Sequence, residues 1–388
     1  MSALRDRTPV VVAARRTPIG TSGHSLARAD LTALLAPPIS AVLGDLPADA
    51  PTVGEVIIGN CWGPGGNPAR VAALAAGLGF DVPALTVDRQ CGSGQEAVHA
   101  AANAIAAGSV ELVLAGGAES PSTAPTRLAR PLTPEGEPKR YDRAPFAPAE
   151  IGDPDMGPAA EMVARRCGIT RERQDRYAAR SHRLTLAAAA AGTFDAEVVP
   201  VVGVGVDERP RPITERTLAR LRPAFEAEGT VTAGNCGSIS DGAAVVAVVP
   251  EYLRKSLELP GLAVRGWIGA GVDPNMPGLG CVPAVQSLLA RAGRSLRDVG
   301  LVEITEAFAA QVLATTDALG LDPFADGDAD VCPQGGAIAL GHPWGASGAL
   351  LVVRLFAQMV RTDGPDFGIS TCAIGGGQGL ALLAQRVG

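Results

Sequence analysis

The chain of 388 residues has few aromatic side chains, since Phe, Trp and Tyr together make up only 4% of it. Its cores must therefore be filled by Val, Leu, Ile and Ala, a composition typical of tightly layered α/β structure. The length is sufficient for two or more packed units rather than one small core. Hydrophobic residues at 47% and charged residues at 19% are ordinary for a soluble globular protein.

The chain also has no excess of positive charge and no long apolar run. Its formal net charge of −7 argues against nucleic acid or an anionic membrane as the main partner, because both need a basic face. A local basic patch remains compatible with a phosphate-bearing substrate. No segment approaches the roughly 20 apolar residues that a membrane helix needs. The short apolar run at 10–14, after a charged start, is typical of a strand and not of a signal sequence.

The cysteines lack the spacing of a metal site or of a disulfide framework. None forms a CxxC pair, so we expect neither a metal nor a redox cofactor. This usage fits a reducing compartment, and we expect a cytoplasmic protein. There are seven: Cys61, Cys91, Cys167, Cys236, Cys281, Cys332 and Cys372.

Short apolar runs bounded by Gly, Pro or Asn predict buried strands. Ala-rich stretches with helical spacing lie between them, notably 93–107 and 345–360. Alternating strands and helices imply βαβ units and largely parallel sheets. The predicted strands are 10–14, 55–59, 85–87, 112–115, 243–249, 301–304 and 368–372.

The two ends of the chain resemble each other. CGSGQEAVHAAANAIAAG leads into ELVLAGGAES near the front, and HPWGASGALLVVRLFAQMV leads into FGISTCAIGGGQG near the back. We interpret this as a duplication, with a first half at 1–250 and a second at 251–388. The stretch at about 120–239 interrupts the alternation of predicted strands and helices and is too long for a simple loop. It is either a semi-independent lobe, carried on the first half, that holds ligand contacts or a solvated surface flap.

Cys91 is the first candidate for chemistry. It lies in DRQCGSGQEAV, between a predicted strand and a predicted helix. A thiol at a helix start faces the positive end of the helix dipole, which lowers its pKa and favours a nucleophile. Gly92 and Gly94 allow backbone to approach a bound acyl group closely. The alternative is an inert buried thiol.

His342 is the second candidate. It is one of only four histidines, and it lies in QGGAIALGHPWGASGA before the second long helix. A histidine there is suited to accept the Cys91 proton and to assist acyl transfer. The alternative is a capping or packing histidine. The glycines could also suggest a phosphate loop, but neither GxGxxG nor GxxxxGK[ST] stands in the required setting.

At this point a resemblance becomes specific. RQCGSG, TAGNCGSISDGA, TEAFAAQ, GGAIALGHPWGASGA and AIGGGQG follow the order and approximate separations of the blocks of the thiolase family. VVAARRTPIG, NPARVAALAAGL and MGPAAEMVARRCGITRERQDRYAARSH match as well, so the resemblance covers essentially the whole chain. It implies an α/β fold of duplicated βαβαβαββ halves in a layered α/β/α/β/α body, with an inserted loop domain over the CoA.

The resemblance also implies an acyl-CoA acyltransferase that works as a homodimer or homotetramer. Cys91 becomes acylated, His342 activates it, and a second cysteine shuttles a proton. Acyl-CoA and CoA are then the partners, with CoA as substrate and no other cofactor. Arg211 is a candidate charge for CoA, although a solvated surface arginine is equally compatible with its setting. The backbone N–H groups near Cys91 and Gly377 are candidate oxyanion donors.

Two catalytic positions depart from the family pattern. Thr305 stands where the family has an Asn that holds a catalytic water, and its hydroxyl has a shorter reach than a carboxamide. The family places its second cysteine immediately before Ile-Gly-Gly-Gly, where this chain has Ala373, and Cys372 lies one residue earlier. On a regular strand this shift aims Cys372 away from the site, whereas a bulge would restore it as the proton shuttle.

Two further departures point to an altered substrate. Asp155 stands where a His is common, and a carboxylate there should repel CoA phosphates if it faces them. Gly237 replaces a Ser that contacts CoA. The rival hypotheses are an acyltransferase or hydrolase without carbon–carbon chemistry, and a non-catalytic subunit that binds acyl-CoA or lipid.

Overall fold

Five strands follow one another in the same spatial order in each half of the chain. The computed structural model describes residues 6–131, 133–134, 136–325 and 330–388. The first half has β4 (Ala84–Val87), β3 (Glu55–Gly59), β5 (Val113–Glu119), β8 (Ser240–Pro250) and β1 (Pro9–Arg16). The second has, in the corresponding order, β11 (Asp330–Val331), β10 (Leu301–Ile304), β12 (Phe367–Ile374), β13 (Gln378–Val387) and β9 (Gly261–Gly271).

The pairing directions repeat as well. β3 runs parallel to both of its neighbours, as β10 does in the second half. The other pairs are antiparallel, and β1 joins β9 through Val10–Ala263 and Val11–Leu262. The structure therefore confirms the predicted duplication at the level of sheet topology. The expectation of largely parallel sheets is wrong, because only β3 and β10 pair with their neighbours in parallel. The short strand β2 (Gly20–Thr21) pairs with β8.

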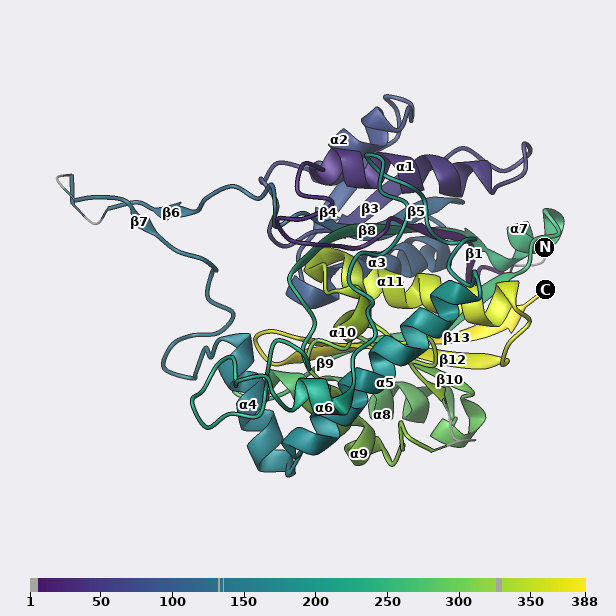
Figure 1. The fold of residues 1–388 in the computed structure, drawn as a ribbon. Coiled ribbons are helices and arrows are strands. Elements are labelled where there is room, and N and C mark those ends of the chain that lie inside the picture. Colours follow the sequence, from purple (N-terminus) through teal and green to yellow (C-terminus); the bar gives the residue numbers. More distant parts are fainter. Residues whose placement is uncertain (1–5, 132, 135, 326–329) are drawn as a thin grey trace.

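Helices cover and separate the two sheets in five layers (Figure 1). On the outer face of the first sheet lie α1 (Leu31–Gly44) and α2 (Pro68–Ala75). Between the sheets lie α3 (Ser93–Ala107) and α11 (Trp344–Phe356), which continues into the π-helical turn Ala357–Arg361. On the outer face of the second sheet lie α8 (Cys281–Ala292) and α9 (Ala309–Leu319). The predicted α/β/α/β/α layering is confirmed.

The predicted elements match those observed to within a few residues. The helix expected at 93–107 has these bounds, ends on Gly108 in the left-handed conformation (φ 78°), and packs its Ala and Val side chains into the central core. The largest omission is α1, because Pro37 and Pro38 lie inside it and Pro ordinarily breaks a helix. The remaining short helices are α7 (Glu251–Ser256) and α10 (Ala337–Leu340).

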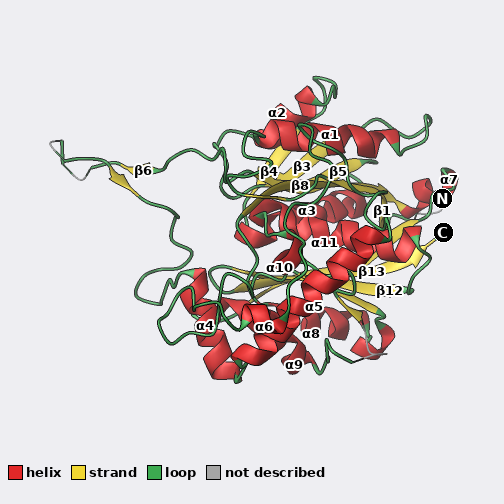
Figure 2. Ribbon diagram, in the orientation of Figure 1, coloured by secondary structure: helices red, strands yellow, loops and turns green. Residues whose placement is uncertain are grey.

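The inserted stretch at about 120–239 contains an arm and a helical part. The arm is a hairpin of β6 (Leu128–Ala129) and β7 (Lys139–Arg140), which extends far from the body (Figures 1 and 2). The helical part has α4 (Met156–Cys167), α5 (Arg171–Ala190) and α6 (Glu215–Leu218). Val163, Tyr177 and Leu218 from these helices are buried in the core that α8 and α9 form. This part is therefore a packed lobe on the second half, not on the first as expected, and not a solvated flap.

No helix among the described residues combines the length and apolar character required to cross a membrane.

Candidate active site

The starts of α3 and α11 touch each other through glycines. A Cβ atom on Gly94 would lie 2.7 Å from the backbone oxygen of Gly345, and one on Gly348 would lie 2.6 Å from the backbone nitrogen of Gln95. Only residues without a side chain permit this approach. Cys91 and His342 directly precede these two helices, so the fold brings the two sequence candidates to one place in the central layer.

Cys91 lies in a tight 3₁₀ turn (η1, Gln90–Gly92) before α3. The preceding residue, Gln90, has φ 43°, a left-handed conformation that is strained for a non-glycine residue. Ser93 stabilises the turn, because its hydroxyl accepts from Arg89 N at 2.8 Å and donates to Gln90 O at 2.6 Å. Strain held by surrounding hydrogen bonds is typical of a positioned functional side chain.

The thiol of Cys91 is half-buried against an apolar cluster of Leu351, Cys372, Ile374 and Leu380. Burial raises its pKa well above the usual range, and the neighbouring Cys372 and Glu119 raise it further. The backbone N–H groups of Cys91 and Gly375 oppose this by hydrogen bonding to the sulfur. The expectation of a lowered pKa is therefore wrong, because desolvation outweighs the helix start. The nucleophile rests as a thiol and needs a base.

One ring nitrogen of His342 contacts a hydroxyl group, and the other has no hydrogen-bond partner among the described residues. Nδ1 lies 2.7 Å from the Ser347 hydroxyl, which also contacts Pro343 O at 3.1 Å. If Ser347 donates to that carbonyl, its oxygen accepts from Nδ1–H and leaves the lone pair on Nε2. Nε2 is buried and has no hydrogen-bond partner within the part of the chain that the structure describes. Burial lowers the pKa of His342 to about 4, so the ring is neutral near pH 7.

Cys372 lies on the Cys91 side of β12. Residues 367–374 pair one for one with β13, so there is no bulge, yet the Cys372 thiol donates to Cys91 O at 3.3 Å. The nearby Thr305 hydroxyl lowers the pKa of this thiol, but burial has the larger effect and raises it to about 12. Ala373 faces the opposite core, under α8 and α9. The expectation that a regular strand turns Cys372 away from the site is wrong, because the face of β12 toward α3 carries residues 372 and 374.

The glycine turn after β12 contributes Gly375, not Gly377, to the Cys91 thiol. Gly377 has φ 80°, and a Cβ atom there would lie 2.4 Å from Val272 O, so this residue fits the turn against the end of β9. Phe146 covers Gly375, since a Cβ atom there would lie 2.7 Å from its ring. The loop before α4 thus lies over the candidate oxyanion donor.

Charged side chains hold that loop together. Arg143 stacks on the Phe146 ring at 4.7 Å and pairs with Asp153 and Asp155, both at 2.8 Å. The single guanidinium therefore offsets part of the negative charge of the two carboxylates. Sequence reasoning missed Phe146 and Arg143, which no spacing signal identifies.

Arg211 is exposed and lies near a second arginine, Arg209, and the buried ring of His182. Arg209 donates to the backbone oxygens of Ile338 and Ala233, both at 3.2 Å. Among the described residues no carboxylate pairs with Arg209 or Arg211. Burial and these two arginines lower the pKa of His182 to about 4. An uncompensated pair of arginines suits a phosphate-bearing ligand.

Gly237 lies between His342 and the backbone of Glu306. A Cβ atom on Gly237 would lie 3.1 Å from both His342 Cβ and Glu306 O, so the glycine leaves room for this contact. Glu306 is buried and accepts from Tyr177 and Ser181 of α5 and from Ile338 N. It therefore ties the inserted lobe to the His342 loop. The described residues contain no group of three or more His, Cys, Asp or Glu side chains that could hold a metal ion.

Family comparisons agree with this arrangement over nearly the whole chain. A sequence model of the N-terminal domain of thiolase matches residues 9–252, and one of the C-terminal domain of thiolase matches residues 260–386. The chain belongs to the thiolase family. It is an acyltransferase, as the sequence predicted.

Relatives and solved structures extend the same result. The chain is 43% identical to an acetyl-CoA acetyltransferase of Pseudomonas aeruginosa, covering 97% of this chain and 99% of the relative. An acetyl-CoA acetyltransferase of Escherichia coli is also 43% identical, with the same coverage.

Among solved structures, the acetyl-CoA acetyltransferase of Bacillus anthracis superposes with a TM-score of 0.91 at 36% identity, covering 99% of this chain and 100% of that one. Human mitochondrial 3-ketoacyl-CoA thiolase in complex with CoA gives 0.90 at 35% identity, covering all of both chains.

Proposed function

We propose that this thiolase transfers acyl groups between CoA thioesters through an acyl–enzyme on Cys91, with CoA as substrate and no other cofactor. The observation that carries the proposal is the close contact between the starts of α3 and α11, the two helices that follow Cys91 and His342. Gly375 N–H lies against the Cys91 thiol, and Nε2 of His342 has no hydrogen-bond partner among the described residues.

In the first step His342 Nε2 takes the Cys91 proton as the sulfur attacks a thioester carbonyl. The new S–C bond forms, and the charge on the carbonyl oxygen is stabilised by the N–H groups of Cys91 and Gly375. The bond from carbon to the CoA sulfur then breaks, and the leaving thiolate takes the proton back from His342. The products are acyl-Cys91 and CoA.

Carbon–carbon chemistry needs a second acid–base group, which we assign to Cys372. In cleavage of a 3-oxoacyl-CoA, Cys91 attacks the 3-oxo carbon and the C2–C3 bond breaks. The electron pair left on C2 takes a proton from the Cys372 thiol, and free CoA then removes the acyl group from Cys91. Condensation is the reverse. The position of Cys372 between Cys91 O and the Thr305 hydroxyl supports this role.

We further propose that Arg209 and Arg211 bind the phosphates of CoA. This assignment uses the uncompensated charge of the two arginines and the contact of Arg209 with the 233–236 loop. With a substrate of this class the enzyme belongs to acyl-lipid metabolism in the cytoplasm.

Association of this chain into a homodimer or homotetramer is also part of the proposal. β4 is the outermost strand of the first sheet, and Leu85 on it is 45% exposed. Nearby Phe80 is 91% exposed. An edge strand flanked by exposed apolar side chains is suited to pair with a second copy. The β6–β7 arm offers a further surface for two dimers to join.

The test is mass spectrometry of the intact protein after mixing with a panel of acyl-CoAs. A mass increase by one acyl group on Cys91, absent in Cys91→Ala, is expected. The matched control is Cys167→Ala, which removes an exposed thiol and should load normally. Acyl loading that persists in Cys91→Ala contradicts the assignment.

A further inference from the structure

Glu119 is a buried carboxylate at the end of β5 on which several donors converge. Two come from the loop after β3 as backbone N–H groups, two are side chains of the same loop, and one belongs to α11. They are Trp62 N at 3.0 Å, Cys61 N at 3.2 Å, Asn60 Nδ2 at 2.8 Å, Cys61 Sγ at 2.8 Å and Gly345 N at 2.9 Å. Burial raises the pKa of this carboxyl, and the hydrogen bonds from Cys61, Gly345 and Trp62 oppose the rise by stabilising the charged form.

The contact with Gly345 bridges the two halves of the chain. Gly345 N belongs to the first turn of α11, where N–H groups have no partner within the helix and a carboxylate is favourable. A Cβ atom on Gly345 would lie 2.8 Å from Glu119 Oε2 and 2.9 Å from Asn60 Cα, so the helix can start here only on a glycine.

The same contact fixes one end of the turn that carries His342. His342 N donates to Ser238 O at 2.8 Å, and three residues later Gly345 N donates to Glu119. The turn is thus held from both sides. Any shift of the carboxylate moves the start of α11, and with it the imidazole, relative to Cys91.

Glu119 also acts on Cys91 by its charge. Its carboxylate is among the groups that raise the pKa of the thiol, after burial and Cys372 of β12. The other titratable or charged groups nearby are Cys61, which donates to Glu119, Asp88, which acts on Cys61, and Arg127, which donates to Cys61 O at 3.3 Å. His342 lies in the turn that precedes α11.

We propose that Glu119 is a positioning residue of the acyl-transfer site, which holds the His342 turn in register with Cys91 and adds negative charge near the Cys91 thiol. The role rests on the proposed function, because it acts through the Cys91–His342 pair. It does not require Glu119 to touch substrate.

Two substitutions separate the geometry from the charge. Glu119→Gln keeps the size but removes the charge and turns an NH₂ group toward N–H donors. We expect acylation of Cys91 by acetyl-CoA to slow by roughly 10-fold or more, with KM changed less than about twofold. The pH midpoint of Cys91 alkylation by iodoacetamide should fall by roughly half a unit or more. Glu119→Asp keeps the charge, so its midpoint should stay at the wild-type value while its acylation is slower.

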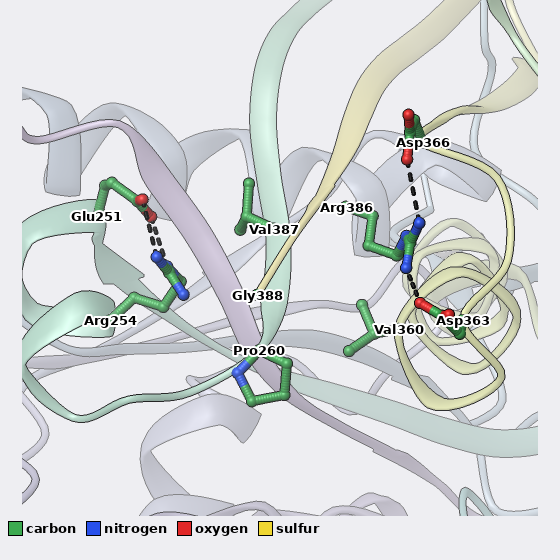
Figure 3. Close-up of a pocket in the computed structure, with 9 residues that line it drawn as sticks. All are labelled: Glu251, Arg254, Pro260, Val360, Asp363, Asp366, Arg386, Val387 and Gly388. Carbon is green, nitrogen blue, oxygen red and sulfur yellow. Dashed lines mark hydrogen bonds and ion pairs between the residues drawn. The ribbon is translucent and has the colours of Figure 1, made fainter.

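Glu251→Gln is the matched control, because Glu251 is also a buried carboxylate but pairs with Arg254 at 2.7 Å beside a surface pocket of about 620 Å³ near the C-terminus (Figure 3). It should lower the melting temperature and leave both Cys91 measurements unchanged.

The proposal fails if Glu119→Gln behaves like this control, with lower stability, the wild-type alkylation midpoint and the wild-type acylation rate. If Glu119→Gln does not fold, wild-type acylation in Glu119→Asp overturns the positioning role. A wild-type protein that no acyl-CoA acylates would refute the proposed function instead, and the alkylation comparison would still test Glu119.

Discussion

The Cys372 thiol donates a hydrogen bond to the backbone carbonyl of Cys91 across 281 residues of sequence, with 3.3 Å between sulfur and oxygen. The contact forms because β12 packs its inner face against the turn that starts α3. A second thiol is thereby held beside the nucleophile without displacing its N–H contact to Gly375. In this arrangement Cys91 can attack the substrate while Cys372 transfers a proton.

His342→Ala should slow acylation of Cys91 by roughly 100-fold or more, the scale of a lost general base. Burial keeps Cys91 as a thiol, so its attack needs a base, and Nε2 of His342 has no hydrogen-bond partner among the described residues and can take the proton. The measurement is rapid-quench acylation with acetyl-CoA, followed by mass spectrometry. His24→Ala, at an exposed histidine, serves as the control. Equal rates in His342→Ala and wild type would leave His342 a structural residue.

Arg211→Ala should raise KM for acetyl-CoA by roughly 10-fold while changing kcat much less, since a phosphate contact remote from the carbonyl contributes to ground-state and transition-state binding alike. Arg216→Ala, an exposed arginine on the same segment, is the matched control. Steady-state kinetics at two salt concentrations test this. An unchanged KM and an unchanged salt dependence would assign Arg211 to the solvated surface.

The free energy of unfolding should fall as the pH is lowered from about 6.5 to about 4. Burial lowers the pKa of both His342 and His182 from 6.5 to about 4 in the folded protein. Between these values the unfolded chain binds more protons than the folded one, so acid favours unfolding, and the loss is complete below about pH 4. Urea unfolding between about pH 7.5 and about pH 5 measures the slope. His182→Gln should reduce it and His24→Gln should not; equal slopes in the two variants would contradict the prediction.

The sequence predicted the parts of the fold and site that depend on local pattern. Alternating apolar runs and Ala-rich helices were sufficient for an α/β fold, whereas the layered arrangement followed from the resemblance to thiolases, and glycine-rich settings identified Cys91 and His342. Contacts between distant segments were not predictable in the same way. Glu119 accepts a hydrogen bond from Gly345 across 226 residues, and neither local sequence contains a pattern that predicts this contact.

The two errors about the site have physical causes of the same kind. The pKa of Cys91 depends on how deeply the thiol is buried, which a helix-start position does not specify. The orientation of Cys372 depends on which face of β12 packs against α3. Strand alternation shows that residues 372 and 373 point to opposite faces, but it does not show which face is inside the site.

Cys372→Ala should remove carbon–carbon bond cleavage and formation yet spare acylation of Cys91. The thiol lies between Cys91 O and the Thr305 hydroxyl, where it can exchange a proton with the carbon next to the thioester, and its pKa of about 12 keeps it protonated at rest. In thiolysis this protonated state is the required one, since the thiol donates to the departing carbon. The assays are acyl loading of Cys91 and thiolysis of acetoacetyl-CoA or a longer 3-oxoacyl-CoA. Cys372→Ser keeps the small size and the Thr305 contact but is a weaker acid, so its thiolysis should fall between the wild type and Cys372→Ala.

The double variant Cys372→Ala with Ala373→Cys separates the position of the thiol from its presence. Residue 373 faces the core under α8 and α9, whereas residue 372 faces Cys91. If the observed β12 register persists, the moved thiol points away from the nucleophile and thiolysis stays lost. Recovery of thiolysis in the double variant would show that the turn at Gly375 can present residue 373 to the substrate. Thiolysis that is undiminished in Cys372→Ala alone would exclude Cys372 as the proton shuttle and leave it as a packing residue beside Cys91.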